Sequence, residues 1–161
     1  MFFRWYFLFA EHGITSDRLD FLGNDDNLDQ HLQRYGNIDI ALDTYPCNGG
    51  TTSCEALWMG VPLVSMTGNF FMSRQGANYL SKLGLNDLIA TTPDAYVRVA
   101  LSFAKDRKRI TMLRKSLRKK VEEILFDPAS HVAELETAYE EMIRRLNCQE
   151  PTTPFSVSNS N

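Results

Sequence analysis

A short run of sequence in the first half of the chain constrains the fold most strongly. Hydrophobic residues at 38–42 predict a buried strand, and a polar loop with two glycines follows at 43–50. Residues 51–59 predict a helix that ends at Gly60, and residues 62–66 predict a second strand. Strands that alternate with helices form βαβ units, whose strands are parallel. Because the crossovers are right-handed, the loops after successive strands share the edge where such sheets bind ligands.

The neighbouring segments extend this alternation. We expect helices over 4–12, 27–35 and 71–83, and short strands over 19–22 and 88–90. Together these segments predict an α/β fold with a partial Rossmann-like, mostly parallel sheet.

The last third of the chain is predicted to be helical. Apolar stripes with a 3.6-residue period run from Val97 to Ala104, from Ile110 to Ile124 and from Val132 to Leu146, and we interpret all three as packing surfaces. The segment after them is polar and contains two prolines. We therefore expect a single domain over 1–146, followed by a disordered tail over 147–161.

Composition excludes several classes of function. Seventeen basic and twenty acidic residues give a formal charge of −3, which does not indicate nucleic-acid binding. Basic residues cluster between Lys105 and Lys120, but flanking acidic residues favour a solvated helix face. Three widely spaced cysteines argue against a disulfide framework and indicate a reducing compartment. Because the apolar start, Met1–Ala10, is too short to span a bilayer, we expect a cytoplasmic protein without membrane contact.

The loop and helix start within 43–55 have the features of an anion site. Gly49 and Gly50 lack a Cβ, which allows the backbone to approach a ligand closely. Thr51 and Thr52 open a helix whose free N–H groups and dipole favour negative charge, and their hydroxyls add two donors. Glu55 follows one turn later and could accept hydrogen bonds from two ribose hydroxyls. The spacing therefore predicts a nucleotide, with phosphate at the helix start and ribose one turn inside.

The same residues also allow an interpretation without a ligand. Thr52 and Glu55 have the spacing of a capping box, and the two glycines could form a simple turn. The sequence contains neither GxxxxGK[ST] nor GxGxxG, which excludes a P-loop and weakens a dinucleotide site. It has no DxD metal-binding motif and no zinc-ligand spacing, so we expect no metal and no cofactor.

Taken as a whole, the run resembles the C-terminal catalytic lobe of the O-linked N-acetylglucosamine transferase family, including its plant SPINDLY-like members. The similarity extends from about Leu19 to Leu146. The segments that carry it are 38–44, Cys47-Asn48-Gly49 with Thr51-Thr52, 57–62, Ser73-Arg74, 83–85 and 88–90.

The resemblance implies a GT-B fold, in which two Rossmann-like domains face each other, and sugar transfer from a nucleotide diphosphate to Ser or Thr of proteins. Carried over by position, Thr51 and Thr52 would hold the diphosphate. Glu55 would hold the ribose, where animal members have Asp. His31 would lie near the nucleotide base, with Arg34 on the same helical face.

Two further residues and two departures follow from the resemblance. Cys47 would lie near the donor sugar, and Arg74 would support the site. His31 and Cys47 also allow plain readings, as a surface or core histidine and as loop packing. Gly50 stands where animal members carry His, and Leu28 stands where they carry Lys. These changes leave the donor open between UDP-GlcNAc and GDP-fucose, which SPINDLY-like members use.

The resemblance covers only part of a catalytic region. The family's other lobe, and the first two strands of its own lobe, have no counterpart here. We therefore expect weakened donor binding and little transfer by this chain alone, with an N-terminal lobe or a second copy completing the enzyme. The partners would be a nucleotide sugar and an acceptor protein, and the general base is not identifiable. A non-catalytic remnant that acts as a protein-interaction module, or a phosphate-binding regulatory domain, are the alternatives.

Overall fold

The computed structural model of the chain describes residues 3–25 and 27–157. The chain falls into two compact units, Met1–Arg34 and Tyr35–Asn161, which are described separately. The single domain expected over 1–146 stays a prediction. In the part of the chain that the structure describes, no helix combines the length and the apolar character needed to cross a membrane.

The first unit contains helix α1 (Phe3–Glu11), the 3-10 turn η1 (Ser16–Arg18) and helix α2 (Leu28–Arg34). Both predicted helices are confirmed to within a residue at each end. The strand predicted over 19–22 is wrong, because this segment is irregular. Leu22 is exposed and the Phe21 ring packs edge-on against Tyr6, so local hydrophobicity serves ring packing and not a sheet.

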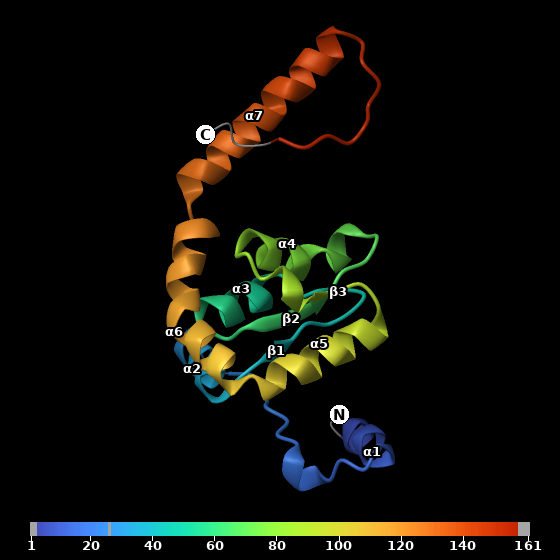
Figure 1. The fold of residues 1–161 in the computed structure, drawn as a ribbon, viewed down its shortest axis with the longest axis vertical. Helices are drawn as coiled ribbons and strands as arrows, with labels where there is room; N and C mark the ends of the chain where they lie inside the picture. The colour runs from blue at the N-terminus through green and yellow to red at the C-terminus, as the bar shows by residue number, and fades with distance from the viewer. Residues whose placement is uncertain (1–2, 26, 158–161) are drawn as a thin grey trace. The chain divides into compact units, whose positions relative to one another are not determined.

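The second unit is built on a three-stranded parallel sheet with the order β1-β2-β3 (Figure 1). The strands are β1 (Ala41–Leu42), β2 (Leu63–Met66) and β3 (Ile89–Ala90). Ala41 pairs with Leu63 and Ser65 pairs with Ile89. The predicted strands and the α/β class are confirmed. Strand β1 begins later than predicted because Tyr35–Asn37 forms a 3-10 turn, η2, and the Ile38 carbonyl accepts a hydrogen bond from Arg114 on helix α6 (Arg107–Ile124).

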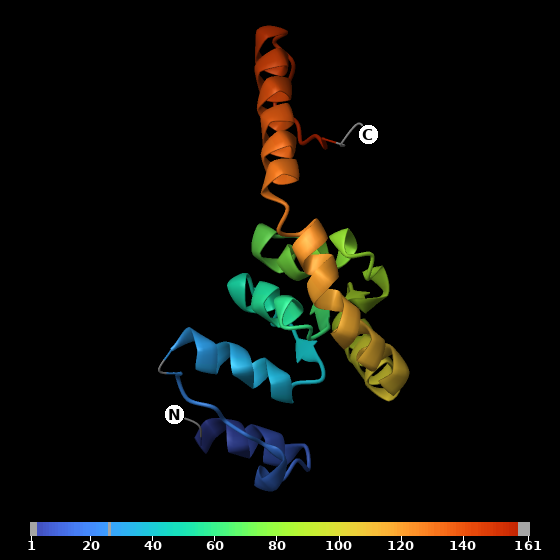
Figure 2. The same ribbon diagram turned by 90° about the vertical axis from the view of Figure 1, so that its left-hand side faces the viewer.

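Helices cover both faces of this sheet. The helices of the unit are α3 (Thr51–Trp58), α4 (Gln75–Lys82), α5 (Pro93–Lys105), α6 (Arg107–Ile124) and α7 (Pro128–Asn147), with 3-10 turns η3 (Phe71–Ser73) and η4 (Asn86–Leu88). Helices α4 and α5 pack against β2 from opposite sides, and α6 lies along α3 (Figures 1 and 2). Where α6 contacts α3, Cζ of the Arg118 guanidinium lies 4.7 Å from the centroid of the Trp58 ring.

The single helix predicted over 71–83 is interrupted. A 3-10 turn ends at Ser73, and α4 starts only at Gln75. Ser73 Oγ accepts from the Phe70 N–H (3.2 Å) and donates to the Phe70 carbonyl (2.9 Å). These short-range bonds close a local turn that competes with a continuous helix.

The three apolar stripes have different outcomes. The α6 stripe is confirmed by four buried residues, Ile110, Leu113, Leu117 and Val121, with Ile124 partly exposed beyond them. The α5 stripe has the wrong phase, because Val97 and Leu101 are exposed and the helix instead packs on the core through Tyr96, Val99, Ala100 and Phe103. Phe103, whose side chain is larger than those of Val97 and Leu101, is the buried residue of this helix.

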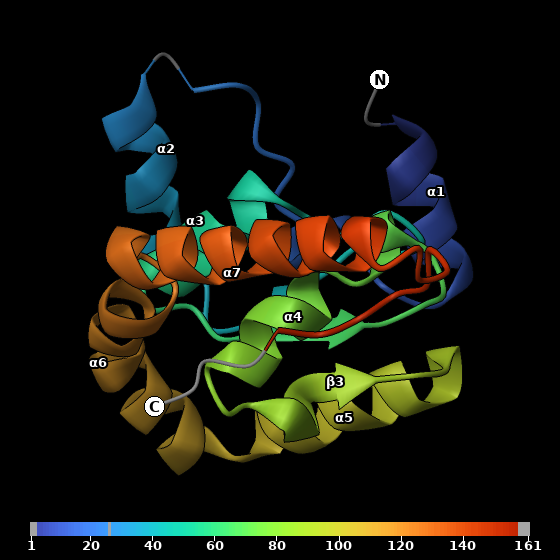
Figure 3. The ribbon, with the colours of Figure 1, turned by 90° about the horizontal axis from the view of Figure 1, so that it is seen from above.

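The α7 stripe is not a core surface. Within the described chain this helix has no buried residue, and its apolar side chains Val132, Leu135, Tyr139, Met142 and Leu146 are exposed. The segment after α7 runs back beside it (Figures 1 and 3). Arg145 holds this segment through a 3.4 Å contact with Thr153 Oγ1 and a stacking contact with the Phe155 ring. The disordered tail expected over 147–161 stays a prediction, and residues 158–161 lie outside the described chain.

Candidate functional site

The loop between β1 and α3 leads into the N-terminus of α3, which no side chain described in the structure caps. Gly50 is the residue that precedes α3. The first N–H groups of a helix have no partner within it, so those of the first turn remain available to a ligand. Thr51 and Thr52 are exposed in this turn. The capping-box interpretation of Thr52 and Glu55 is wrong, because Thr52 lies inside the helix and not at its cap.

The glycines of the turn are required by close packing. A Cβ at Gly49 would lie 2.5 Å from Ser53 Oγ and 2.6 Å from Thr52 Oγ1. A Cβ at Gly50 would lie 3.0 Å from Gln75 Oε1, so the side chain of Gln75 on α4 reaches this turn. Gly49 and Gly50 therefore form a tight turn packed against the side chains of α3 and α4. No side chain described in the structure caps the α3 N-terminus that follows this turn.

Glu55 lies one turn into α3 and is half-buried beside Tyr35. The Tyr35 hydroxyl lies 3.4 Å from Glu55 Oε2 and 3.3 Å from the Thr52 carbonyl oxygen, and it donates toward both. Burial, together with the negative charge and hydrogen bond of Glu55, raises the pKa of Tyr35, so this hydroxyl stays protonated. Tyr35 was not predicted as a site residue. Its contact with Glu55 joins residues 20 apart in the sequence, which no local motif reveals.

A small cavity adjoins these residues. It has a volume of about 170 Å³ and its lining includes Tyr35, Asp43, Thr44, Gly49 and Thr52. Pockets that enclose a small-molecule ligand usually measure about 300–1,000 Å³. The described cavity is therefore too small to enclose a nucleotide sugar.

Asp43, which directly follows β1 and begins the loop, lies behind the turn. Only 8% of this residue is exposed. Its Oδ1 accepts the Gly49 N–H at 2.8 Å, and its Oδ2 accepts the Ser65 hydroxyl at 2.6 Å. Sequence reasoning missed Asp43, although its place at the end of a predicted strand and the start of the loop was a usable signal.

Asn48 fixes the same loop to the sheet. Its Nδ2 donates to the Thr44 carbonyl at 2.8 Å and toward the Met66 carbonyl at 3.3 Å. Its own N–H donates to the Met72 carbonyl at 2.8 Å. Among the side chains that the structure describes, Asn48 Oδ1 is buried without a hydrogen-bond partner. Cys47, the predicted sugar neighbour, lies in this loop and is exposed.

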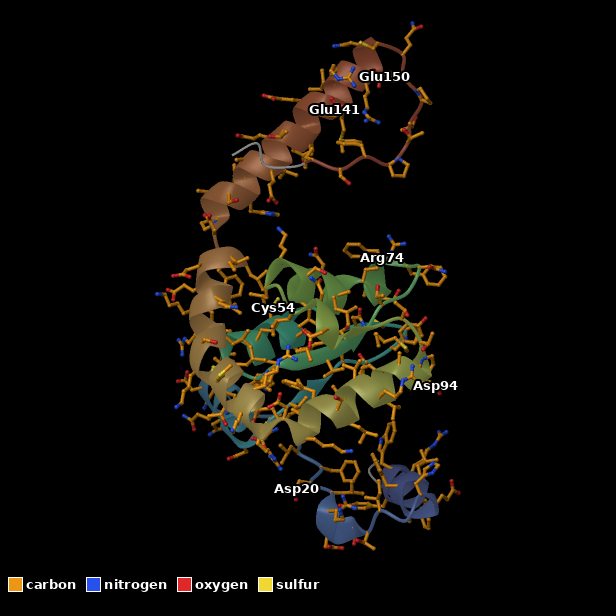
Figure 4. The ribbon with its side chains drawn as sticks, viewed as in Figure 1. Asp20, Cys54, Arg74, Asp94, Glu141 and Glu150 are labelled. Atoms are coloured by element: carbon orange, nitrogen blue, oxygen red, sulfur yellow. The ribbon has the colours of Figure 1, made fainter. Side chains whose placement is uncertain are left out.

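Arg74 lies in the connection between β2 and α4 (Figure 4). Its Nε donates to the Gly68 carbonyl at 3.1 Å and its Nη2 donates to the Asn69 carbonyl at 2.6 Å. A second cavity, of about 480 Å³, is lined in part by Arg74 and by Gln75, the residue that reaches Gly50. Arg74 therefore fixes the backbone at Gly68 and Asn69, in the segment that leads from β2 to α4.

His31 and Arg34 belong to the first unit. They lie on one side of α2, where both contact Asp25: His31 Nδ1 is 3.0 Å from Oδ2, and Arg34 Nη2 is 2.5 Å from Oδ1. Arg34 also donates to the Gly23 carbonyl at 2.7 Å. The predicted shared face of these two side chains is therefore present, and their place near a nucleotide base stays a prediction.

Among the residues with described positions, no cluster of three His, Cys, Asp or Glu side chains could hold a metal ion. The described site is made of backbone N–H groups, hydroxyls and one half-buried carboxylate, Glu55. Such a set suits an anion with neighbouring hydroxyls.

Comparison with known proteins identifies the family to which the chain is similar. Residues 7–135 match the sequence profile of glycosyl transferase family 41. A probable UDP-N-acetylglucosamine–peptide N-acetylglucosaminyltransferase SPINDLY of Hordeum vulgare is 42% identical over 136 residues, 84% of this chain. The UDP-N-acetylglucosamine–peptide N-acetylglucosaminyltransferase of Caenorhabditis elegans is 30% identical over 143 residues, 88% of this chain. The chain spans 14% and 12% of the lengths of these two relatives.

A solved structure shares the fold. A mutant O-GlcNAc transferase of Thermobaculum terrenum superposes with a TM-score of 0.77 at 36% identity, over 86% of this chain and 27% of its own. This match confirms the predicted GT-B-type parallel sheet with C-terminal helices.

Proposed function

Because the chain belongs to glycosyl transferase family 41, we propose that it supplies the nucleotide-sugar diphosphate site of a protein O-glycosyltransferase. A UDP- or GDP-sugar would be the donor, and Ser or Thr of a protein would be the acceptor. The open N-terminus of α3, with two exposed threonines after a tight glycine turn, is the observation that carries the proposal. No metal and no cofactor are part of it, and the cytoplasmic location expected from the composition stays a prediction.

The chemistry assigned to this site is stabilisation of the leaving group. When the sugar departs, negative charge grows on the nucleoside diphosphate. The helix N–H groups and the hydroxyls of Thr51 and Thr52 would stabilise that charge, because they are donors already held in place. Glu55, oriented by the Tyr35 hydroxyl, would accept hydrogen bonds from the ribose. In the same proposal Cys47 faces the sugar, while His31 and Arg34 serve the base.

We propose further that this chain alone binds the donor weakly and transfers little or no sugar. The cavity beside Thr52 has a volume of about 170 Å³, too small to enclose a nucleotide sugar. Family relatives are much longer than this chain, which spans 14% of the barley SPINDLY protein. An additional lobe, or a second copy of this chain, would supply the other wall of the donor site and the acceptor surface.

Isothermal titration calorimetry with UDP and with GDP tests the diphosphate site. Thr52→Ala and Glu55→Ala should each weaken binding by about tenfold, since each loses a hydrogen bond to the ligand. Thr137→Ala is a matched control, because Thr137 also lies exposed on a helix and donates only to the Ala133 carbonyl in its own helix. Equal affinities in all three variants and the unmodified chain would contradict the proposal.

A second candidate function is a protein-interaction module without catalysis. The exposed apolar side chains of α7 and of Leu42 on the edge strand β1 favour it. This candidate predicts a stably folded chain with no measurable affinity for UDP or GDP. A phosphate-binding regulatory domain would instead bind inorganic phosphate about as well as the nucleotides.

A further inference from the structure

Asp43 is a buried carboxylate placed where a negative charge should be unfavourable. Burial of a charged group costs free energy unless hydrogen bonds compensate it. A negative charge behind an anion-binding turn also repels the anion. Asp43 is nevertheless buried, with only 8% of the residue exposed, and it lies at the junction of β1 and the loop that leads to Thr51. Its position therefore calls for a role that outweighs both costs.

The hydrogen bonds of Asp43 join the turn to the rest of the unit. Oδ1 accepts the Gly49 N–H at 2.8 Å, and Ser53 Oγ on α3 lies 3.5 Å from the same oxygen. Oδ2 accepts the Ser65 hydroxyl of β2 at 2.6 Å. The two carboxylate oxygens thus hold the turn and α3 on one side and the central strand on the other.

Two further elements close around the same residue. The Tyr96 hydroxyl of α5 donates to the Asp43 carbonyl oxygen at 2.8 Å. Helix α4 approaches so closely that a Cβ at Gly76 would overlap both Asp43 Oδ2 and Ser65 Oγ. Four elements besides the loop therefore fix Asp43, namely α3, α4, α5 and β2. A carboxylate held this firmly is a suitable anchor for a turn whose other side faces a ligand.

We propose that Asp43 is a positioning residue for the diphosphate site, an inference that rests on the proposed function. By holding the Gly49 N–H inward, Asp43 fixes the turn so that the N–H groups of Gly50, Thr51 and Thr52 form the donor set at the helix end. Asp43 itself does not touch the ligand. Its carboxylate is used because hydrogen bonds to a charged acceptor are stronger than those to a neutral one.

Two substitutions separate the hydrogen bond from the charge. Asp43→Asn keeps an oxygen that can accept the Gly49 N–H, and its new amide can donate to Ser65 Oγ, which is able to accept. It also removes the charge that repels the anion. Asp43→Ala removes both. The role as a positioning residue therefore predicts rescue of nucleotide affinity by Asn, whereas Ala should lose it.

Titration calorimetry of the 161-residue chain with UDP and GDP, together with thermal unfolding, tests this inference. Asp43→Ala should weaken UDP binding by about tenfold among the folded molecules, and Asp43→Asn should stay within about threefold of the unmodified chain. If Asp43→Ala does not fold, Ser65→Ala decides, because it removes one hydrogen bond to Oδ2 and should weaken binding by a few fold.

The outcomes distinguish this inference from the proposed function. Loss of UDP affinity in Thr52→Ala but not in Asp43→Ala or Ser65→Ala would overturn the role of Asp43 and leave the nucleotide site standing. Equal loss in the Ala and Asn variants would also overturn it, since the hydrogen bond would not be what matters. No binding by the unmodified chain would overturn both.

Discussion

Gly76→Ala tests the packing that closes α4 over the candidate site. A Cβ at this position would overlap Asp43 Oδ2 and Ser65 Oγ, and would lie 2.8 Å from Ser65 Cβ. Relaxed carbon–carbon contacts measure about 3.5–4.0 Å, so α4 or β2 would have to move. Ser65 is fully buried, which leaves its side chain little room to rotate away.

The size of the effect follows from two opposing contributions. Overpacking of a well-packed interior costs about 1–3 kcal/mol, occasionally more. Replacing Gly by Ala in a helix returns up to about 1 kcal/mol. Because the collision includes Ser65 Cβ, which moves only with the backbone of β2, we expect an overpacking cost of about 2–3 kcal/mol. Subtracting a helix gain of about 1 kcal/mol leaves a net loss of about 1–2 kcal/mol of unfolding free energy. A chain of this size loses about 2–4 °C of Tm for each kcal/mol.

Urea and thermal unfolding measure this loss, and Gly36→Ala is the matched control. Nothing lies within 4 Å of a Cβ at Gly36, and its φ is not in the left-handed region. The control should therefore keep the Tm of the unmodified chain or raise it slightly, because Ala lowers the entropy of the unfolded chain. UDP calorimetry on the same samples should show weaker binding in Gly76→Ala, because the carboxylate of Asp43 is displaced. A Gly76→Ala variant as stable as the control would refute the packing argument.

Three further predictions concern other parts of the chain. Tyr35→Phe should weaken UDP binding by only about two- to fivefold, because its contacts at 3.3 and 3.4 Å are long, and calorimetry measures this. Leu117→Ala should cost about 2–5 kcal/mol, and Leu135→Ala less than about 1 kcal/mol, in urea unfolding, since the first side chain is fully buried and the second is exposed. Hydrogen bonds from Arg144, and then from Arg145, lower the pKa of Glu141 from 4.5 to about 2. Because the pKa is lowered, this contribution to α7 is present above pH 4.5 and is lost as the pH falls toward 2. NMR titration of the Glu141 carboxyl checks it, and Arg144→Gln should raise the measured pKa.

The elements around the candidate site could be predicted from the sequence, because several local signals agree there. A hydrophobic run, a glycine pair and a helix that ends at Gly60, whose φ is +78°, each indicate the same strand–turn–helix unit. The strand predicted over 19–22 was wrong because hydrophobicity alone does not supply a partner strand. The packing surface predicted on α7 was wrong for a related reason. The period of the apolar residues from Val132 to Leu146 shows that the helix is amphipathic, but it does not show whether the apolar face is covered.

The residues that sequence reasoning missed act across long separations. Asp43 depends on Ser65, 22 residues later, and on the close approach of α4 at Gly76. Tyr35 depends on Glu55, 20 residues later. No local spacing encodes these contacts, because each joins elements that only the tertiary fold brings together. Thr51 and Thr52 could be proposed as ligand-binding residues because the chemistry of a helix N-terminus is local, whereas the residues that hold the turn are set by tertiary packing.

The proposed contacts to the diphosphate and to the base lie in different parts of the chain. The residues of the proposed diphosphate site, and the groups that hold them, all lie between Tyr35 and Tyr96, within one compact unit. The proposed base contacts, His31 and Arg34, lie in the other unit, and Cys47 is exposed. Under the proposed function, affinity for the diphosphate would depend on one compact unit, while selection of the base and the sugar would depend on residues outside it. On this reasoning, substitutions that disturb Asp43 or Thr52 should weaken UDP and GDP alike, because both nucleotides present the same diphosphate to the same turn.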